Sequence, residues 1–313
     1  MADAATLFEN ERPRLFGAAY RMLGSRAEAE DLVQETYLRW HRTERARVRN
    51  PQAWLVTAVT RLAIDRLRSL KTEREAYDGP WLPEPLIRLE PPPPDRTVEV
   101  EDDLSVAFLV LLERLGPEER ALFLLRDVFD LDYRDVAEAL GKSEAACRQA
   151  VHRARRRLAA ERRRFEVSEN ERIRLLERFD AAVAAQDEAA LLALFAPDSE
   201  WTSDGGGKVH AARKVLRGPE WITRLVLGVT RKVYPSDVTR RLATINGEAG
   251  LLFELGGRIV AAMSIATDGE RILAVYQVLN PDKLPTSGLG QNPAAATVDK
   301  GPVTGAGALP STR

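Results

Sequence analysis

Hydrophobic side chains recur at three- and four-residue spacing through roughly the first 75 residues, and this spacing predicts helices. Ser25 and Glu28 have the spacing of a capping box, in which each side chain satisfies a free backbone amide at a helix start. Asn50-Pro51 begins the next predicted helix, because Asn caps helices well and Pro is tolerated in the first turn. The amphipathic stripe that follows Ser25 consists of Ala29, Leu32, Val33, Thr36, Tyr37 and Trp40.

The helical pattern stops between residues 76 and 103, where prolines accumulate. Proline lacks the amide proton that a helix needs, so the segment is predicted to be an extended and rather stiff linker. Trp81 and Leu82 lie within it, and large apolar side chains are stabilised by burial. We therefore expect part of the linker to pack on a neighbouring domain.

Residues 104–166 return to helical spacing and contain a pattern typical of a helix-turn-helix. That motif needs a small residue where its helices touch, a turn residue that tolerates left-handed geometry, and apolar anchors on the second helix. Residues of these kinds occur in order as Val136, Ala137, Leu140, Gly141, Cys147 and Val151. The second helix would then present outward Ser143, Glu144, Arg148, Gln149, His152, Arg153 and Arg156. The pattern alone leaves open whether this helix binds DNA or is a solvated basic helix.

The pattern changes again near residue 168. Two amphipathic helices are predicted at about 169–186 and 188–196, followed by alternating stretches typical of strands at 198–203, 235–245, 248–256, 258–267 and 270–279. Asn246-Gly247, Gly256-Gly257 and Asp268-Gly269 fall between these stretches and indicate hairpin turns. Helices followed by an antiparallel meander predict an α+β domain over 168–284. Residues 285–313 are rich in Gly, Ala, Pro, Ser and Thr, which predicts a disordered tail.

Composition narrows the class of protein. The chain has 313 residues, 44% hydrophobic and 30% charged, so it is long enough for two or three domains with cores of their own. We find neither an apolar run long enough to span a membrane nor an export signal. A single cysteine cannot form an internal disulfide, and three histidines are few for a zinc site. We expect a cytoplasmic protein with no metal and no cofactor.

Charge is distributed unevenly although the net charge is only −1. Residues 101–141 carry 11 acidic and 4 basic side chains, whereas residues 142–165 carry 9 basic and 2 acidic ones. This reversal creates a positive local field on the second helix of the predicted helix-turn-helix. A field of that sign suits a polyanion such as DNA.

Two of these segments together resemble a known family. The string from Ala29 to Leu38 is similar to the region 2 helix with which sigma-70 factors bind RNA polymerase, and residues 50–68 resemble the segment that captures the −10 promoter element. The helix-turn-helix is similar to region 4, which reads the −35 element. Two sigma domains, at 5–75 and 104–166, without regions 1 and 3, resemble an extracytoplasmic-function (ECF) sigma factor. The resemblance implies polymerase contacts by Asp31, Gln34, Glu35 and Leu38, contacts to −10 DNA by Asn50, Arg61, Arg66 and Arg68, and contacts to −35 DNA by the outward residues of the second helix.

Residues 168–284 resemble a SnoaL-like domain, which has the NTF2-like cone fold. Three short strings match the subgroup of ECF factors in which this domain is fused to the sigma domains, and they comprise Trp81, Leu82, Pro83, Glu84 and Pro85 in the linker, Asp204, Gly205, Gly206, Gly207 and Lys208, and Asn280, Pro281, Asp282, Lys283 and Leu284. Three consecutive glycines are expected where backbone bends sharply or lies against a partner. We expect the linker to dock near the glycine loop and the last string, and the three strings to have a regulatory role.

The resemblance implies a transcription initiation factor and not an enzyme, with core RNA polymerase and promoter DNA as partners. The fused domain is expected to regulate the chain in cis, so that no separate anti-sigma factor is needed, and its cavity could bind a small molecule. The alternative is a helix-turn-helix regulator with a ligand-binding or catalytic domain. Asp204 and His210 are the only suggestive catalytic candidates, and they do not form a recognisable acid–base pair, so no catalytic residue is assigned.

Overall fold

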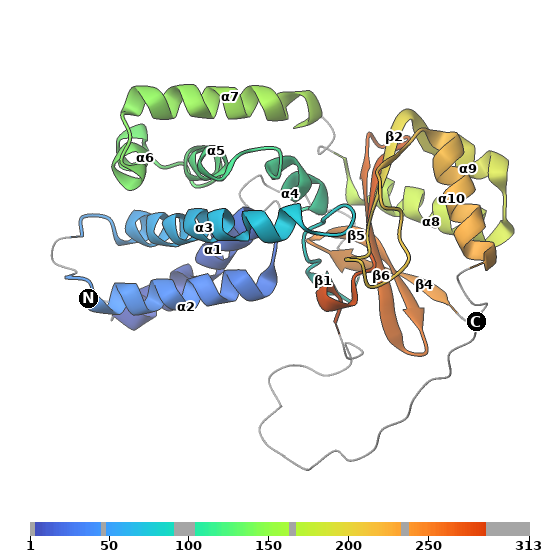
Figure 1. The fold of residues 1–313 in the computed structure, drawn as a ribbon, viewed down its shortest axis with the longest axis horizontal. Helices are drawn as coiled ribbons and strands as arrows, with labels where there is room; N and C mark the ends of the chain where they lie inside the picture. The colour runs from blue at the N-terminus through green and yellow to red at the C-terminus, as the bar shows by residue number, and fades with distance from the viewer. Residues whose placement is uncertain (1–3, 45–47, 91–103, 163–166, 233–237, 286–313) are drawn as a thin grey trace, which may run out of the picture.

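The protein consists of a helical half and a sheet-containing half that lie side by side (Figure 1). The computed structural model describes residues 4–44, 48–90, 104–162, 167–232 and 238–285. Within those ranges, no helix is both long and apolar enough to cross a membrane. The predicted tail at 285–313 falls almost entirely outside the described residues.

The first helical unit contains α1 (Ala4–Leu23), α2 (Arg26–Arg42) and α3 (Pro51–Glu75). The predicted cap of α3 forms, because Asn50 Oδ1 accepts a hydrogen bond from the Ala53 amide at 3.1 Å. The predicted capping box at the start of α2 is wrong. Ser25 makes no side-chain cap and instead donates to Glu84 at 3.2 Å, while Glu28 binds Arg66. A distant carboxylate thus replaces the local partner that the sequence spacing suggested.

The second helical unit contains the predicted helix-turn-helix. Its elements are α4 (Val106–Leu112), α5 (Pro117–Phe123), the π-helical turn η2 (Leu124–Val128), α6 (Tyr133–Leu140) and α7 (Glu144–Arg162). Gly141 ends α6 in the left-handed conformation, with φ of 62°. Cys147 and Val151 are fully buried anchors on α7. The motif is therefore confirmed, and Cys147 is a core residue as its position on the apolar stripe predicted.

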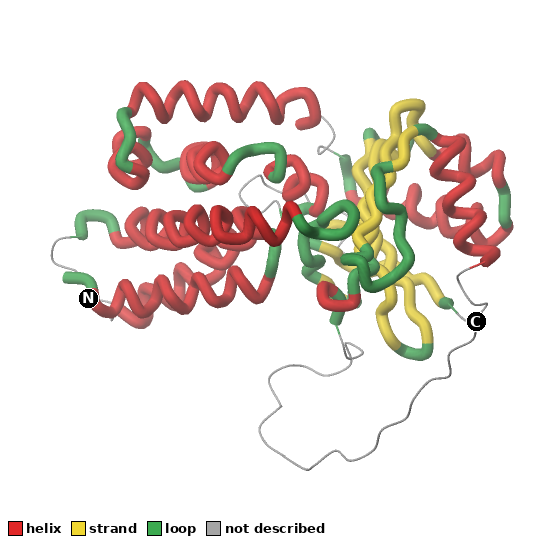
Figure 2. The backbone as a smooth tube through the Cα atoms, viewed as in Figure 1, coloured by secondary structure: helices red, strands yellow, loops and turns green. Residues whose placement is uncertain are grey.

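The two helical units pack directly against each other, although a linker separates them in the sequence. They share a single hydrophobic cluster that contains residues such as Leu55 and Val59 of α3 and Phe123 and Leu125 of the second unit. The helix α3 lies against both α5 and α6. Figure 2 shows the same arrangement, with the helices of the two units stacked in layers. This common core fixes how the two units face each other.

The C-terminal unit is an α+β domain. Its helices are α8 (Glu169–Ala185), α9 (Glu188–Leu194) and α10 (Pro219–Lys232). Its strands are β2 (Phe195–Asp204), β3 (Leu216–Arg217), β4 (Thr239–Ile245), β5 (Glu248–Leu255), β6 (Arg258–Thr267) and β7 (Ile272–Val278), followed by the 3-10 turn η3 (Pro281–Lys283). The three predicted hairpin turns are confirmed, because β4, β5, β6 and β7 pair as antiparallel neighbours.

Two features of this domain differ from the sequence prediction. The helix α10 falls in a segment for which no element was predicted. The sheet is also not a pure antiparallel meander, because β2 pairs with β7 in parallel and completes the order β1-β4-β5-β6-β7-β2-β3. The chain crosses from one side of the sheet to the other through the long segment that contains α10, which local alternation cannot reveal.

The sheet is covered on both faces. Leu251 and Phe253 of β5 face the helices α8, α9 and α10, whereas Leu252 between them faces the linker and α4. The linker itself becomes an edge strand, because β1 (Ile87–Arg88) pairs antiparallel with β4. Leu82 is buried on this second face, and burying such a side chain stabilises the fold by ~1.5–3 kcal/mol. The expectation that the linker packs on a neighbouring domain is confirmed.

Candidate nucleic-acid interface and interdomain clamp

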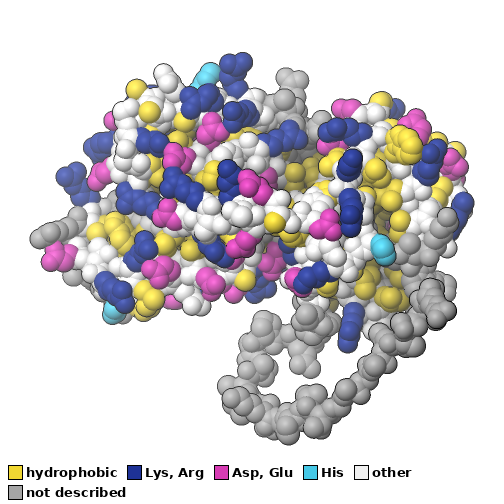
Figure 3. Space-filling view, viewed as in Figure 1, with side chains coloured by type: hydrophobic (Ala, Val, Ile, Leu, Met, Phe, Trp, Pro, Cys, Tyr) yellow, Lys and Arg dark blue, Asp and Glu magenta, His cyan; other side chains and the backbone are white. Residues whose placement is uncertain are grey.

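The outward face of α7 is open to solvent. All seven residues predicted to meet −35 DNA are exposed, namely Ser143, Glu144, Arg148, Gln149, His152, Arg153 and Arg156. Figure 3 shows basic side chains along the upper edge of the helical half, where α7 lies. The Arg148 guanidinium is positioned by an ion pair with Glu144 at 2.6 Å and by the Tyr133 ring, whose centroid is 4.6 Å away. The face offers a pre-arranged basic surface to a nucleic acid.

Other arginines of α7 are paired with the acidic segment that precedes it. Arg155 makes two hydrogen bonds with Asp127, at 2.8 and 2.6 Å, and Arg157 makes one with Glu119 at 2.6 Å. Glu119 also lies 3.7 Å from Arg153. Part of the positive charge of α7 is thus neutralised by acidic side chains of the same helical unit. Arg156 has no ion pair among the described residues, so its charge is the one most available to a phosphate.

The arginines predicted to meet −10 DNA lie on α3, and each already has hydrogen-bond or ion-pair partners within the protein. Arg61 donates to the carbonyl oxygens of Ala139 and Glu138 at the end of α6, the latter at 3.1 Å. Arg68 pairs with Glu118 of the second helical unit at 2.5 Å. The remaining arginine, Arg66, binds Glu28 of its own unit, also at 2.5 Å. Of the four predicted residues, Asn50, Arg61 and Arg68 are exposed and Arg66 is partly buried, and the Asn50 side chain serves as a helix cap.

The residues predicted to meet the polymerase form one exposed row on α2. Asp31, Gln34 and Leu38 are exposed, and Leu38 is among the few large hydrophobic side chains of the described chain that are open to solvent, at 48%. Glu35 lies in the same row and pairs with Arg39 at 3.0 Å. The row is therefore accessible to a partner, although a single exposed leucine does not by itself mark a binding surface.

A buried ion network joins the two helical units behind these surfaces. The Arg120 side chain is only 3% exposed and donates to the Met22 carbonyl at 2.6 Å and to Glu113 at 2.9 Å. Glu113 also binds Arg74 of α3 at 2.7 Å. Burial alone would raise the pKa of Glu113, but Arg120 and Arg74 outweigh it and hold the pKa below its usual range. The carboxylate therefore stays charged and bridges the units.

The three recognisable strings meet around one buried carboxylate. Asp204 is fully buried at the end of β2. Its Oδ1 accepts from the Tyr77 hydroxyl at 2.6 Å, and its Oδ2 accepts from the Leu82 amide and from Lys283 Nζ, both at 2.8 Å. Lys283 also donates to the Leu82 carbonyl at 2.6 Å. We call this arrangement of Tyr77, Leu82, Asp204 and Lys283 the clamp.

Burial of the clamp shifts the pKa values of its titratable groups. Burial lowers the pKa of the Lys283 ammonium, and the Asp204 carboxylate opposes that shift. Burial, with the hydrogen bond to Asp204 next in importance, raises the pKa of Tyr77, which therefore remains a neutral donor. The second Lys–Asp pair between the strings differs, because Lys208 and Asp282 are 51% and 62% exposed. Only the buried pair is expected to contribute appreciably to stability.

The glycine loop permits the close approach of the strings. Gly206 has φ of 60°, and a Cβ there would lie 2.3 Å from the Asn280 side chain. Gly207 has φ of 70°, and its Cβ would lie 3.1 Å from that of Asp78 in the linker. Both positions combine left-handed backbone with contact to a partner string, which is the situation that consecutive glycines predicted.

The linker string also binds the first helical unit. The Trp81 ring lies between two cations, with the Arg74 guanidinium 4.0 Å and the Lys283 ammonium 4.2 Å from its centroid. Glu84 accepts from the Arg26 amide at 2.9 Å, and its own amide donates to the Gly24 carbonyl at 2.8 Å. Pro83 and Pro85 are buried beside it. The string thus connects the start of α2 to the clamp.

Sequence reasoning missed Asn246, which joins all three units. Its side-chain amide donates to the Tyr20 hydroxyl at 2.7 Å and to the Leu104 carbonyl at 2.8 Å, and its Oδ1 accepts from the Leu86 amide at 2.9 Å. The only signal in the sequence was the Asn-Gly pair, which indicated the turn but not these partners. Tyr77 was missed for the same reason, because its partner lies 127 positions away in the chain.

Comparison with known proteins identifies the family. The sigma-70 region 2 family matches residues 7–73, and the sigma-70 region 4 family matches residues 105–158. The ECF RNA polymerase sigma factor SigJ of Mycobacterium tuberculosis is 37% identical over 303 residues, covering 93% of this chain and 96% of SigJ. The chain belongs to the ECF sigma factor family. Another relative, the M. tuberculosis ECF factor SigG, is 34% identical over 224 residues, covering 64% of this sigma factor and 60% of SigG.

The fold of the sigma factor agrees with this assignment along nearly its whole length. The crystal structure of M. tuberculosis SigJ matches with a TM-score of 0.70 and 33% identity, covering 89% of this chain and 97% of SigJ. Two helical sigma domains are followed by an α+β domain of the NTF2-like cone type. This sigma factor therefore directs promoter recognition by RNA polymerase. The alternative of a helix-turn-helix regulator that acts without the polymerase is set aside.

The two catalytic candidates of the C-terminal domain lie in different surroundings. Both carboxylate oxygens of Asp204 are occupied in the clamp, whereas His210 is exposed. They are not assembled into an acid–base pair. Among the residues that the structure describes, no three His, Cys, Asp or Glu side chains are grouped so that they could hold a metal ion.

Proposed function

We propose that the C-terminal domain regulates this sigma factor in cis by holding the two sigma domains in a closed arrangement. The observation that carries the proposal is the clamp, in which one buried carboxylate binds the linker at Tyr77 and Leu82 and the last string at Lys283. A linker held in this way is a structural part of the C-terminal domain. It no longer acts as a free tether.

The clamp restrains both sigma domains. On one side, Glu84 and Trp81 attach the linker to region 2 at the start of α2 and at Arg74. On the other side, α4 of region 4 is buried between the sheet and the helical core, with Val106 and Ala107 packed on the sheet and Phe108 in the core. Region 4 is thereby held against α3, where it engages Arg61 and Arg68. Opening the clamp would free these arginines.

The roles of the exposed residues follow from the family. Asp31, Gln34, Glu35 and Leu38 are proposed to bind the core polymerase through the exposed row on α2. Asn50, Arg61, Arg66 and Arg68 are proposed to bind −10 DNA once the chain has opened. The outward residues of α7 are proposed to bind −35 DNA, with base contacts near its start and phosphate contacts further along.

Regulation within one chain supports two further proposals. The closed arrangement performs the task of an anti-sigma factor, so no separate anti-sigma partner is expected. The C-terminal domain is proposed to have no catalytic activity, because Asp204 serves as a structural acceptor. Purified protein should therefore not turn over model ketones, and turnover abolished by Asp204→Asn would contradict this.

The test is transcription by core polymerase from a cognate promoter at limiting sigma factor. Asp204→Asn keeps the size of the side chain but removes the charge that holds Lys283. We expect several-fold more transcript, because the sigma domains separate more readily. Tyr77→Phe, which removes a single hydrogen bond to Asp204, should act in the same direction with a smaller effect.

The matched control is Lys208→Ala, which removes the exposed Lys–Asp pair between the same two strings and should leave transcript levels unchanged. Glu35→Lys should abolish transcription by weakening polymerase binding, with thermal unfolding unaltered. If both clamp variants remain folded and transcription does not rise, the proposed regulation is wrong.

A further inference from the structure

The tip of the hairpin between β4 and β5 lies where the three units of the chain meet. Asn246 occupies this tip and is only 4% exposed. Its backbone is left-handed, with φ of 55°, which asparagine tolerates better than most residues. Glycine would satisfy the turn equally well, so this position adds a buried side-chain amide to the turn.

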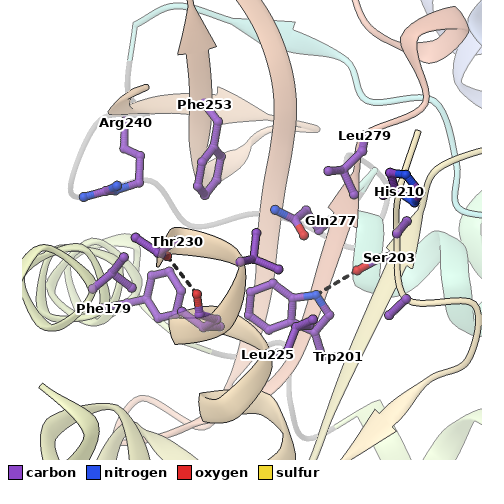
Figure 4. A pocket seen from close by; sticks show the side chains of 15 residues that line it. Phe179, Trp201, Ser203, His210, Leu225, Thr230, Arg240, Phe253, Gln277 and Leu279 are labelled. Carbon is purple, nitrogen blue, oxygen red and sulfur yellow. Dashed lines mark hydrogen bonds between the residues drawn. The ribbon is translucent and has the colours of Figure 1, made fainter. Parts of the chain in front are cut away.

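The tip belongs to the face of the sheet that carries the linker. Ile245, next to Asn246, packs in one cluster with Leu82 of the linker. A narrow cavity lies on the other face, with Trp201 and Phe253 among its lining residues and Asn246 not among them (Figure 4). The contacts of the tip are therefore made to the linker and the sigma domains, outside the cavity.

The two N–H groups of the Asn246 side chain bind different sigma domains. The amide nitrogen donates to the Tyr20 hydroxyl of region 2 at 2.7 Å and to the Leu104 carbonyl at the start of region 4 at 2.8 Å. The amide oxygen accepts from the Leu86 amide of the linker at 2.9 Å. One planar group thus fixes three segments that are far apart in the sequence.

The Tyr20 hydroxyl extends these contacts to the linker. Tyr20 is fully buried, and its hydroxyl donates to the Glu84 carbonyl at 2.5 Å while it accepts from Asn246. Burial raises the pKa of Tyr20, so the hydroxyl stays protonated and keeps both roles. These groups are neutral, unlike the carboxylate of the clamp. Hydrogen bonds of this kind are stronger in a dry interior than in water.

We propose that Asn246 is a positioning residue of the closed arrangement, which bridges regions 2 and 4 directly. The bridge rests on the proposed function, because it adds a second point of restraint to the clamp. The clamp binds the linker, whereas the bridge binds one atom of each sigma domain. When either domain moves away, water reaches the amide and weakens its bond to the other domain. Release of one domain therefore favours release of the other.

The test measures distances in the full chain by pulsed electron resonance between spin labels on introduced cysteines. Arg134→Cys in region 4 and Glu177→Cys in the C-terminal domain are exposed positions, whereas the native Cys147 is buried and stays unlabelled. A second pair, Arg42→Cys and Glu177→Cys, follows region 2. The population of long distances reports the opening of each sigma domain.

The decisive variant acts on region 2 and is read out on region 4. Tyr20→Phe removes a hydroxyl that is bound to Asn246 and Glu84, yet the open population of region 4 should rise by about two- to tenfold, as for one hydrogen bond. Asn246→Gly removes the whole bridge without straining the turn and should raise this population further. In the Asn246→Gly background, Tyr20→Phe should not move region 4 again.

The matched control is Asp268→Asn, which exchanges a carboxylate for an amide at another hairpin turn. The Asp268 side chain accepts from the Glu270 and Arg271 amides of the same turn, so both distance distributions should stay unchanged. Thermal unfolding of each variant separates domain opening from loss of the fold. If Tyr20→Phe moves region 2 alone, or moves region 4 equally in the Asn246→Gly background, Asn246 does not bridge the domains.

The bridge and the proposed function fail separately. Distances that follow the expected pattern would support the bridge even if transcription were insensitive to Asp204→Asn. Conversely, Asp204→Asn can raise transcription while region 4 is unaffected by Tyr20→Phe, and then only the bridge is wrong.

Discussion

The two helices proposed to bind DNA, α3 and α7, differ in the partners that their arginines have within the chain. The outward face of α7 is exposed to solvent, and the Arg148 side chain is positioned by Glu144 and Tyr133. The corresponding arginines of α3 are all engaged, two of them by region 4 itself. Both helices were expected to bind nucleic acid, and both carry the basic side chains for it. The difference lies in what the rest of the chain places against them.

This contrast suggests which step the proposed regulation would control. A duplex can reach α7 without any rearrangement, whereas a melted −10 strand would compete with contacts that Arg61 and Arg68 already make. Under the proposed regulation, the closed arrangement would therefore restrain the capture of unpaired −10 bases and leave the first contact with the −35 duplex unrestrained. Four measurements test how the units are coupled and how α3 and α7 differ.

The largest effect is expected from the buried network that joins the units. Arg120→Ala would leave Glu113 with one partner fewer in the interior, and breaking such a pair costs about 3–5 kcal/mol. Chemical unfolding should show this loss. Arg134→Ala is the control, because its pair with Asp135 is largely exposed and should be nearly neutral. A loss below about 1 kcal/mol for Arg120→Ala would mean that the units are not coupled through this network.

The next largest effects are expected on DNA binding by α7, where Arg148 and Arg156 should have different roles. Arg148→Ala should remove ~1–3 kcal/mol of discrimination at one −35 position, because it lies near the start of the helix. Arg156→Ala should weaken binding to all sequences alike and reduce the salt slope by about one, as expected for a phosphate contact. Binding to a set of single-base variants of the duplex, at several salt concentrations, distinguishes them. Identical profiles for the two variants would contradict the division.

A smaller effect is expected when opening of the clamp is compared for the two kinds of DNA. Asp204→Asn should tighten binding of a −10 single strand by about tenfold, or ~1.4 kcal/mol, because it frees the α3 arginines. Binding of the −35 duplex should not change, since α7 is already open. Fluorescence anisotropy with labelled oligonucleotides measures both, with Lys208→Ala as the control. Equal changes for both ligands would show that the clamp does not act selectively on α3.

The smallest effect is a pH dependence at Glu113. Its pKa is depressed in the folded protein, so the stability it contributes is present above the pKa of the unfolded chain and is lost as the pH falls through the folded value. As the pH falls from about 5 to 3, the free energy of unfolding should fall more steeply for the unchanged protein than for Glu113→Gln. Parallel curves for the two proteins would exclude this carboxylate as the origin.

Local patterns in the sequence predicted most of the elements because their causes are local. Gly141 and the anchors Cys147 and Val151 specify the helix-turn-helix, and Asn246-Gly247 specifies a hairpin. The short strand β1 and the helix α10 escaped prediction. The first forms only because β4 offers its edge to a proline-rich segment, and the second connects distant strands.

For the candidate sites, too, the sequence predicted local features and did not predict tertiary contacts. Helical periodicity placed the outward residues of α7 and the row on α2 on exposed faces, where the structure has them. It could not show that Arg61 reaches the carbonyl oxygens of α6, because 77 and 78 residues separate the partners in the chain. The glycine loop could be singled out by its composition. Its actual neighbours, Asn280 and Asp78, depend on the tertiary fold.

Pairing of β1 with β4 limits the length of free chain that connects regions 2 and 4. While residues 77–90 are held by β4, the clamp and the start of α2, only residues 91–103 can lengthen the connection between regions 2 and 4, and thirteen residues span at most ~45 Å. If the whole linker from 76 to 103 is released, its contour length rises to ~100 Å. Docking of the linker on the C-terminal domain therefore limits how far regions 2 and 4 can separate.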